Sequence, residues 1–251
     1  MLRRAINGWI LFVRFLLGWS WSLAIALAFC GLCPVFGARR LWRWLRLPWA
    51  RVTLSLVGIR LEVRGAEHLA GPAVFVANHE SLIDVVILPA LVPRETLFVA
   101  KRALRLIPLW GWAFAAGGAL LIDRKNARAA FAALREGTKL LPPSWSLTVF
   151  PEGTRSRTGR LGRFKRGAFV LAREVGRDVV PVGLSGARDI VAADGWLVRG
   201  GTVRVAIGPP LSTAAFAERP LREFIAAGEA AVAACVTAAA DAGVGPPAAG
   251  R

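Results

Sequence analysis

The 251-residue sequence has no tyrosine and only two histidines, three cysteines and one methionine. Three cysteines are too few for a disulfide framework. Cys30 and Cys33 form a C-x-x-C motif, but without a second pair or a nearby histidine it does not predict a metal or redox site, and we interpret both as small, buried packing residues. The sequence also lacks a G-x-S-x-G motif and any cluster of metal-ligating residues, so neither a serine nucleophile nor a metal centre is predicted.

Acidic residues are scarce as well. Asp and Glu total 16 against 33 Lys and Arg, which gives a net charge of +17 and a pI near 11.7. The hydrophobic fraction of 55% excludes a disordered chain, and it exceeds what one water-soluble core of this size usually hides. A chain that is both basic and apolar indicates either an anionic membrane or nucleic acid as its partner.

The distribution of charge favours the membrane. No acidic residue precedes Glu62, whereas residues 1–61 contain nine arginines and six of the ten tryptophans. Arg and Trp together are typical of a membrane–water boundary. Residues 15–38 form an uncharged run that is long enough to cross a bilayer, or to fold back on itself if Gly31 and Pro34 break the helix.

The arginines at 39, 43 and 46 follow the uncharged run at helical spacing, with apolar residues between them. This pattern predicts a helix that lies in the membrane interface. A cleaved signal peptide is disfavoured, because the apolar run is longer than a typical signal core and no A-x-A site ends it.

From residue 59 onward the sequence is typical of an α/β domain, because short apolar runs alternate with helical stretches. We expect a largely parallel central sheet flanked by helices, preceded by an N-terminal membrane-associated helical segment. The predicted divisions are an Arg/Trp-rich anchor at 1–51, the α/β domain at 52–241 and a flexible tail at 242–251. Strands are predicted at 59–64, 73–77, 96–100, 119–123, 146–150, 179–185 and 202–208, and helices after Ser81 and at 126–140, 166–175 and 219–241.

Ligands of open α/β sheets bind beyond the carboxyl ends of the strands, and polar residues follow one such run closely. His79 comes directly after the apolar run at 73–77, and Asp84 follows five residues later. Ser81 and Asp84 have the spacing of a capping box, which predicts a helix that begins at Ser81. His79 would then lie before that helix and could hydrogen-bond Asp84 as an oriented base, with backbone N–H groups of the first turn as oxyanion donors. The alternative is that Ser81 and Asp84 are only helix caps.

Basic residues follow three further strands. Lys101, Arg124 and Arg155 each stand at or just beyond a predicted strand end, and Gly153 permits close backbone approach to a ligand. A guanidinium at such a place can hold a phosphate with two hydrogen bonds. The alternative is a solvated surface arginine, one of 29 in this sequence.

Four ordered motifs carry a resemblance to a known family. These are NHESLID (78–84), GALLIDRKN (118–126), FPEGTRSRTGRLGRFKRGAF (150–169) and VVPVG (179–183), with AKRALRLIPLWGW (100–112) between the first two. The chain resembles the glycerolipid acyltransferase superfamily over roughly residues 59–210, and within it the bacterial 1-acyl-sn-glycerol-3-phosphate acyltransferases. Leu121 departs from the pattern at a position that phenylalanine often holds.

The resemblance implies roles for individual residues. His79 would be the catalytic base and Asp84 the carboxylate that holds it. The residues that would bind the acyl acceptor and its phosphate are Lys101, Arg124, Glu152, Gly153, Thr154 and Arg155.

The resemblance also implies the reaction. An acyl chain would pass from acyl-CoA or acyl-carrier protein to the 2-hydroxyl of lysophosphatidic acid, with no covalent enzyme intermediate and no resident cofactor. The partner would be the anionic phospholipid of a bacterial inner membrane, with the site facing the cytoplasm and no nucleic acid bound. A lyso-ornithine lipid or another lysolipid is the alternative acceptor. A non-catalytic basic protein that binds membrane or nucleic acid is the distant alternative.

Overall fold

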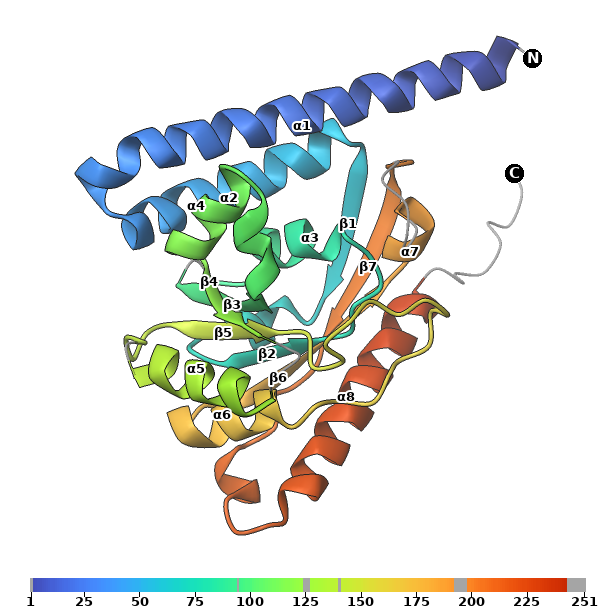
Figure 1. Cartoon of the computed structure of the whole chain (residues 1–251). Helices are drawn as coiled ribbons and strands as arrows, with labels where there is room; N and C mark the ends of the chain where they lie inside the picture. Colours follow the sequence, from blue (N-terminus) through green and yellow to red (C-terminus); the bar gives the residue numbers. More distant parts are fainter. Residues whose placement is uncertain (1, 94, 124–126, 140, 192–197, 243–251) are drawn as a thin grey trace.

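The computed structural model describes residues 2–93, 95–123, 127–139, 141–191 and 198–242. A seven-stranded sheet lies between two layers of helices, and a long helical hairpin lies over one of these layers (Figure 1). The strands are β1 (Ile59–Arg64), β2 (Val74–Ala77), β3 (Thr96–Lys101), β4 (Ala119–Ile122), β5 (Ser146–Val149), β6 (Val179–Ser185) and β7 (Gly201–Ile207). The α-helices are α1 (Leu2–Phe36), α2 (Ala38–Leu56), α3 (Asp84–Leu91), α4 (Trp110–Gly117), α5 (Ala127–Lys139), α6 (Gly167–Val175), α7 (Ala187–Ile190) and α8 (Leu221–Asp241), and the 3-10 helices are η1 (Ala66–Leu69), η2 (Arg102–Leu106) and η3 (Ala214–Phe216).

The sheet has the strand order β1-β7-β6-β2-β5-β3-β4. Strands β2 to β6 run parallel to one another. Strand β7 pairs antiparallel with β6, and β1 pairs parallel with β7. Both faces are buried, as strand β2 shows: Phe75 and Ala77 pack in the cluster that includes α2, α3 and α4, and Val74 and Val76 pack in the cluster that includes α6 and α8. The predicted α/β class with a largely parallel sheet is confirmed.

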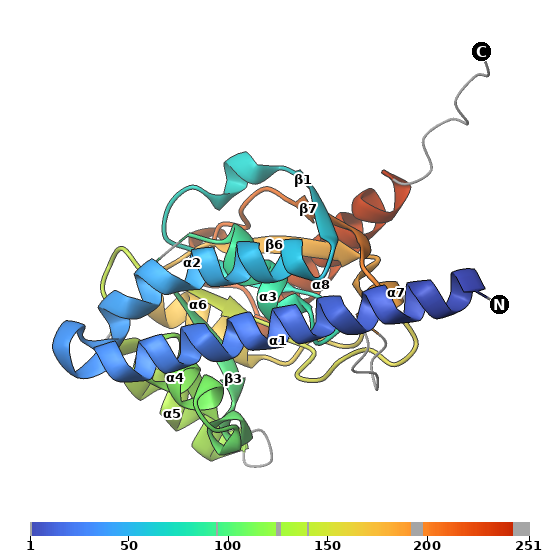
Figure 2. The same cartoon turned by 90° about the horizontal axis from the view of Figure 1, so that it is seen from above.

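The N-terminal helices form an antiparallel hairpin. Helix α1 continues through Pro34, and the chain turns at Gly37, whose φ of +78° favours glycine. Figure 2 shows α1 lying along the domain with α2 beside it. The Trp49 indole donates to Ser22 Oγ across the hairpin at 3.1 Å.

The prediction that residues 39–49 lie in the membrane interface is wrong for the face that contains Trp42 and Arg46. Leu41, Trp42 and Trp49 are buried in the protein core, and Arg46 is 1% exposed. The helical spacing identified an amphipathic helix correctly, but its apolar face packs on α3 and α4 instead of on lipid. Helix α2 also extends to Leu56, five residues beyond the expected end of the anchor.

Two described helices are long and apolar enough to span a bilayer, the Gly8–Phe36 part of α1 and helix α8. They differ in environment. Helix α8 packs directly against β6. The two backbones are so close at Gly183 that a Cβ added there would come within 2.3 Å of the backbone of Cys235. Helix α1 instead exposes large apolar side chains along its length, including Trp9 at 66% and Trp19 at 52%. Cys30 and Cys33 on this helix are free and half-buried, not buried as expected.

Candidate functional site

The site is built at the junction between two neighbouring strands, β2 and β6. Asn78 follows β2, and its side chain bridges to β6: the amide nitrogen donates to the Leu184 carbonyl at 2.9 Å, and the amide oxygen accepts from the Leu184 N–H at 2.7 Å. A buried side-chain amide that is satisfied on both sides fixes its backbone firmly. The next residue, His79, is therefore held at the carboxyl edge of the sheet.

His79 and Asp84 are in direct contact. The distance from His79 Nδ1 to Asp84 Oδ2 is 2.8 Å, and the Asp84 side chain is fully buried while that of His79 is 12% exposed. The backbone N–H groups of Glu80 and Ser81 donate to the same Asp84 oxygen at 2.8 and 2.9 Å. These donors and the imidazole stabilise a buried negative charge that orients the histidine ring. The predicted pairing of the two side chains is present.

The predicted capping box is present in part: the Ser81 N–H donates to Asp84 Oδ2 at 2.9 Å and the Ile83 N–H to Ser81 Oγ at 3.4 Å, but the predicted start of the helix is wrong. Helix α3 begins at Asp84 instead of Ser81, and its N-cap residue, Ile83, makes no side-chain cap. Ser81 Oγ donates to the Val191 carbonyl at 2.7 Å, so Ser81 ties the loop to α7. Of the backbone N–H groups after Ser81, those of Ile83 and Asp84 donate to the Ser81 hydroxyl and carbonyl, each at 3.4 Å, and the role of this turn as an oxyanion donor stays a prediction.

Phe150 supports the imidazole from one side, a role that the sequence interpretation missed. Its ring is stacked on His79 with centroids 4.1 Å apart and an interplanar angle of 17°. Phe150 follows β5, which pairs with β2, so the two strand ends bring the rings together. The available signal was the position of Phe150 directly before the Pro-Glu-Gly-Thr-Arg motif. A stacked ring leaves the imidazole little freedom to rotate.

Glu152 holds the strand ends together. One carboxylate oxygen accepts from the His79 N–H at 2.8 Å and the other from the Gly162 N–H at 2.9 Å. The Ser156 N–H donates to the His79 carbonyl at 2.7 Å. The loop after β5 is thus fastened to the backbone of His79 on both sides. Both Glu152 oxygens are engaged by backbone, so this buried side chain fits a structural role better than the acceptor contact that the resemblance implies.

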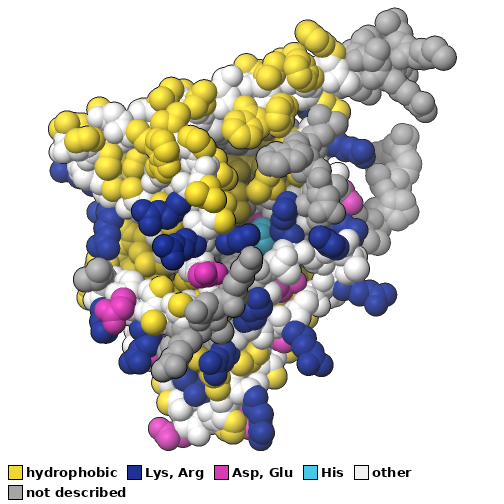
Figure 3. All heavy atoms as spheres, viewed as in Figure 1, with side chains coloured by type: hydrophobic (Ala, Val, Ile, Leu, Met, Phe, Trp, Pro, Cys, Tyr) yellow, Lys and Arg dark blue, Asp and Glu magenta, His cyan; other side chains and the backbone are white. Residues whose placement is uncertain are grey.

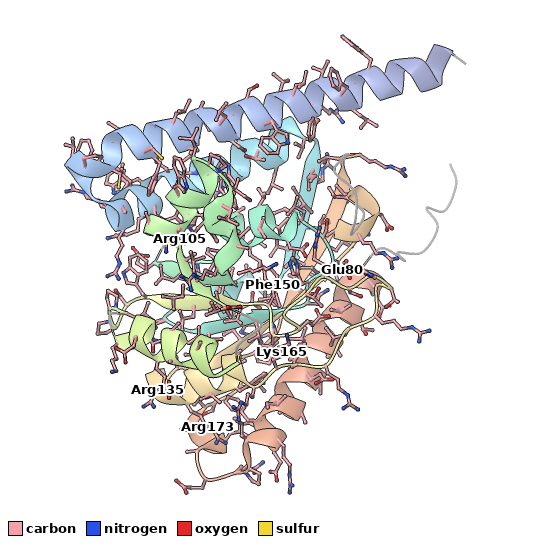
Figure 4. All side chains as sticks on the ribbon, viewed as in Figure 1. Glu80, Arg105, Arg135, Phe150, Lys165 and Arg173 are labelled. Carbon is pink, nitrogen blue, oxygen red and sulfur yellow. The ribbon has the colours of Figure 1, made fainter. Side chains whose placement is uncertain are left out.

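Glu80 is a second buried carboxyl group beside the pair. Burial, and secondarily the nearby charge of Asp84, raises the pKa of Glu80 to about 7. Its Oε1 accepts from the Asn78 amide at 3.3 Å. Burial also raises the pKa of Glu152, against the lowering effect of its two backbone hydrogen bonds. Figure 4 shows Glu80, Phe150 and Lys165 at one end of the sheet, whereas Arg135 and Arg173 lie away from it by α5 and α6.

The raised pKa of Glu80 predicts that the stability of the folded protein depends on pH. Because the folded state keeps this proton up to about pH 7 while the unfolded chain releases it near pH 4.5, the folded state binds more protons in that window and stability falls as pH rises. A Glu80→Gln variant should therefore gain stability relative to the wild type between pH 4.5 and 8, by about 3 kcal/mol. Chemical denaturation at several pH values measures this difference. The exposed Glu218→Gln is the matched control, and an equal pH response in both variants would contradict the assignment.

The residues expected to bind the acceptor lie at this edge but differ in exposure. Arg155 is half-buried, and Lys101 and Thr154 are exposed. Arg124 lies outside the described residues. Gly153 has a φ of +75°, and a Cβ there would come within 2.7 Å of Lys165 Nζ, so the close approach that this glycine permits is made by a lysine.

Further basic residues of the loop after β5 were not singled out from the sequence. The loop and its neighbour α7 carry Arg157, Arg160, Arg163, Lys165, Arg166 and Arg188. The Arg188 guanidinium lies against Gly159, where an added Cβ would be 2.7 Å away. Figure 3 shows a belt of Lys and Arg side chains below the apolar surface of the N-terminal helices. The site thus opens on a strongly positive surface, which suits an anionic ligand.

Two hollows lie near the sheet ends. A mostly apolar cavity of about 160 Å³ reaches from Phe150 and Gly153 to Val99, between the sheet and helices α5 and α6, with Lys165 at its rim. The larger hollow, of about 750 Å³, lies at the opposite edge of the sheet beside Arg177 and Asp178 and contains none of the candidate residues. Within the described ranges, no three His, Cys, Asp or Glu side chains gather as a metal site would require.

These observations define an α/β protein in which a histidine at the carboxyl edge of the sheet is paired with a buried aspartate. The profile of the Acyltransferase family matches residues 60–185, which is half of the chain and runs from β1 to the end of β6. The chain belongs to the Acyltransferase family and is an acyltransferase.

Individual relatives agree. The chain is 32% identical over 215 residues to a 1-acyl-sn-glycerol-3-phosphate acyltransferase of Saccharomyces cerevisiae, covering 80% of this chain and 71% of that protein. It is 31% identical over 199 residues to the protein of that name from Pseudomonas aeruginosa, covering 77% of each. The crystal structure of a 1-acyl-sn-glycerophosphate acyltransferase from Thermotoga maritima has the same fold, with a TM-score of 0.78 at 22% identity over 98% of this chain and 99% of that one. The resemblance inferred from the four motifs is confirmed.

Proposed function

We propose that this acyltransferase moves an acyl chain from a thioester to the 2-hydroxyl of lysophosphatidic acid, with His79 as the general base. The observation that carries this proposal is the 2.8 Å contact between His79 Nδ1 and the buried Asp84. Because Nδ1 is engaged, Nε2 is the ring nitrogen left to take a proton. The names of the relatives, 1-acyl-sn-glycerol-3-phosphate acyltransferases, support the acceptor.

The proposed reaction is a direct transfer. His79 Nε2 takes the proton of the 2-hydroxyl as its oxygen attacks the thioester carbonyl, and a tetrahedral intermediate forms. The C–S bond then breaks, the carbonyl re-forms as an ester, and the departing sulfur receives the proton from His79. Asp84 stabilises the imidazolium between these two steps, and Phe150 keeps its ring in place.

The phosphate of the acceptor would be held by the positive rim of the site. Arg155 is our first candidate, because it lies between Glu152 and Ser156, which both hydrogen-bond the backbone of His79. A planar guanidinium can bind a phosphate with two parallel hydrogen bonds. Lys101 is the last residue of β3, and Lys165 lies against Gly153 (Figure 4), so both add positive charge at this edge.

Arg155→Ala should raise the KM for lysophosphatidic acid about tenfold or more, with a smaller effect on kcat, because a hydrogen bond between charged groups is worth about 1.5–3 kcal/mol. Steady-state kinetics with the acceptor varied measure this split. Arg157→Ala removes an exposed arginine from the same loop and should behave like the wild type. If KM and kcat are both unchanged in Arg155→Ala, Arg155 does not belong to the site.

The apolar outer surface supports seating on a membrane. Helix α1 exposes Trp and Leu side chains, and it contacts the domain towards both ends: the Arg14 guanidinium lies within 2.7 Å of a Cβ placed on Gly58, and the Phe29 ring within 3.0 Å of one placed on Gly117. The apolar surface continues from α1 over η2 and α4, where Leu106 is 82% and Trp112 53% exposed (Figure 3). We place this surface on anionic phospholipid at the cytoplasmic face of a bacterial inner membrane.

Leu106→Glu should weaken binding to phosphatidylglycerol vesicles about tenfold, because an apolar side chain of this size gains about 1.5–3 kcal/mol on burial and the new carboxylate is repelled by the lipid. Vesicle co-sedimentation measures the change. Thr237→Glu adds the same charge to an exposed position of α8, on the other side of the sheet, and is expected to bind as the wild type does. Equal binding by the wild type and both variants would show that η2 does not belong to the membrane-binding surface.

The acyl donor that we propose is acyl-CoA or acyl-carrier protein, used as a co-substrate with no resident cofactor. The function is tested by offering the purified protein lysophosphatidic acid and lyso-ornithine lipid side by side with one thioester donor. We expect phosphatidic acid to form with release of one thiol per ester made. Acylation of the lyso-ornithine lipid alone would show that this lipid, and not lysophosphatidic acid, is the acceptor. The absence of product with both lipids would overturn the proposal.

A further inference from the structure

Arg46 is a fully buried arginine in a helix that belongs to the N-terminal hairpin. It lies in the middle of α2 and is only 1% exposed. Its guanidinium donates to three backbone carbonyls: NH1 to Pro89 at 2.8 Å, and NH2 to Val92 at 3.2 Å and to Pro93 at 2.7 Å. Burying a guanidinium is costly unless its donors are satisfied, so this arrangement indicates a specific task.

The three carbonyls define that task, because they belong to the last turn and the exit of α3. The carbonyls of a helix C-terminus lack partners within the helix and carry partial negative charge, which a cation stabilises. Helix α3 is only eight residues long, about 12 Å, and its first residue is Asp84. Arg46 therefore holds one end of the short helix whose other end carries the partner of His79.

We propose that Arg46 is a positioning residue, which fixes α3 against the membrane-seated hairpin and thereby sets the contact between Asp84 and His79. The proposal rests on the function proposed above. Two turns of helix move as a unit, so a shift at Pro89 is transmitted to Asp84. A misplacement of about 1 Å can cost about 100-fold in rate when reacting groups are otherwise in place.

Arg43 provides a matched control. It lies one turn before Arg46 on α2 and pairs with Glu95 of the segment after α3 at 2.8 Å, but its side chain is 46% exposed. An exposed ion pair of this kind contributes little. Arg43→Met therefore removes a charge from the same helix and the same contact region without touching the end of α3.

The test compares Arg46→Met, Arg46→Lys and Arg43→Met by NMR of the protein labelled with 15N-histidine in detergent micelles. The chain has only two histidines, His68 and His79, so His79→Ala assigns both sets of ring signals. We expect the His79 signals to shift in Arg46→Met and to shift less in Arg46→Lys, while His68 stays unchanged and Arg43→Met matches the wild type. His79 signals that are identical to those of the wild type in both Arg46 variants would overturn the proposal.

Kinetics provide the second measurement. With lysophosphatidic acid as acceptor, Arg46→Met should lower kcat at least about tenfold with little change in KM, and Arg46→Lys should recover part of the loss. If Arg46→Met does not fold, Arg46→Lys decides alone: wild-type kcat and wild-type His79 signals contradict the proposal. A wild type that makes no phosphatidic acid refutes the proposed function, whereas the histidine spectra still decide the role of Arg46.

Discussion

Replacing His79 with alanine should lower the rate of acyl transfer by about 100-fold to 10,000-fold, which is the usual contribution of a general base. The physical reason is that the 2-hydroxyl of the acceptor is a weak nucleophile until a base removes its proton. The nitrogen that would do so belongs to an imidazole held between the buried Asp84 carboxylate and the Phe150 ring. Initial rates of phosphatidic acid formation measure the loss.

The control for this variant is His68→Ala, which removes the other histidine, on η1 and partly exposed. It should keep the wild-type rate. Both variants should fold and keep the vesicle binding of the wild type, because the His79 side chain lies outside the hydrophobic core. If His79→Ala folds and turns over at more than about a tenth of the wild-type rate, His79 is not the base.

Asp84→Asn should cost at least about 100-fold in kcat, although it changes the volume of the side chain very little. Asp84 Oδ2 accepts from two backbone N–H groups as well as contacting His79 Nδ1. An amide presents an N–H in place of one oxygen, so it can face the ring with a donor and favour the wrong tautomer of His79. It also removes the charge that stabilises the imidazolium.

The measurement that checks Asp84→Asn is kcat and KM for lysophosphatidic acid, with the exposed Asp189→Asn as the matched control. Asp189 lies close enough to influence the Glu80 carboxyl but makes no contact with His79 among the described residues. We expect its kinetics to match those of the wild type. Similar kinetics for Asp84→Asn would mean that the charge of Asp84 is not needed.

Much of the fold was predictable from the sequence because strands that are buried on both faces leave short, continuous apolar runs. The runs at 73–77 and 146–150 correspond to β2 and β5, each to within one residue. The His79–Asp84 pair was also predictable, since a loop histidine and a carboxylate in the first turn of the next helix can meet at that spacing. The ring contact with Phe150 was not, because it depends on β2 and β5 being neighbours in the sheet.

The start of α3 and the burial of Arg46 escaped prediction for a different reason. Ser81 keeps the backbone hydrogen bond to Asp84 that its spacing predicts, but its hydroxyl donates to the Val191 carbonyl, a partner that only the tertiary structure brings close. The arginines of α2 repeat at helical spacing, which defines a face but not its neighbour. Only the packing of α2 on α3 decides that Arg43 is exposed and Arg46 is not.

The central claim is a direct transfer from the thioester to lysophosphatidic acid without an acyl-enzyme. It is tested most directly in a single turnover, with enzyme in excess over a thioester that carries a labelled acyl chain and with lysophosphatidic acid present. We predict that the label passes into the 2-position of phosphatidic acid as fast as free thiol appears. No label should be attached covalently to the protein at any time. Label on the protein before product forms, or thiol release without phosphatidic acid, would contradict this account.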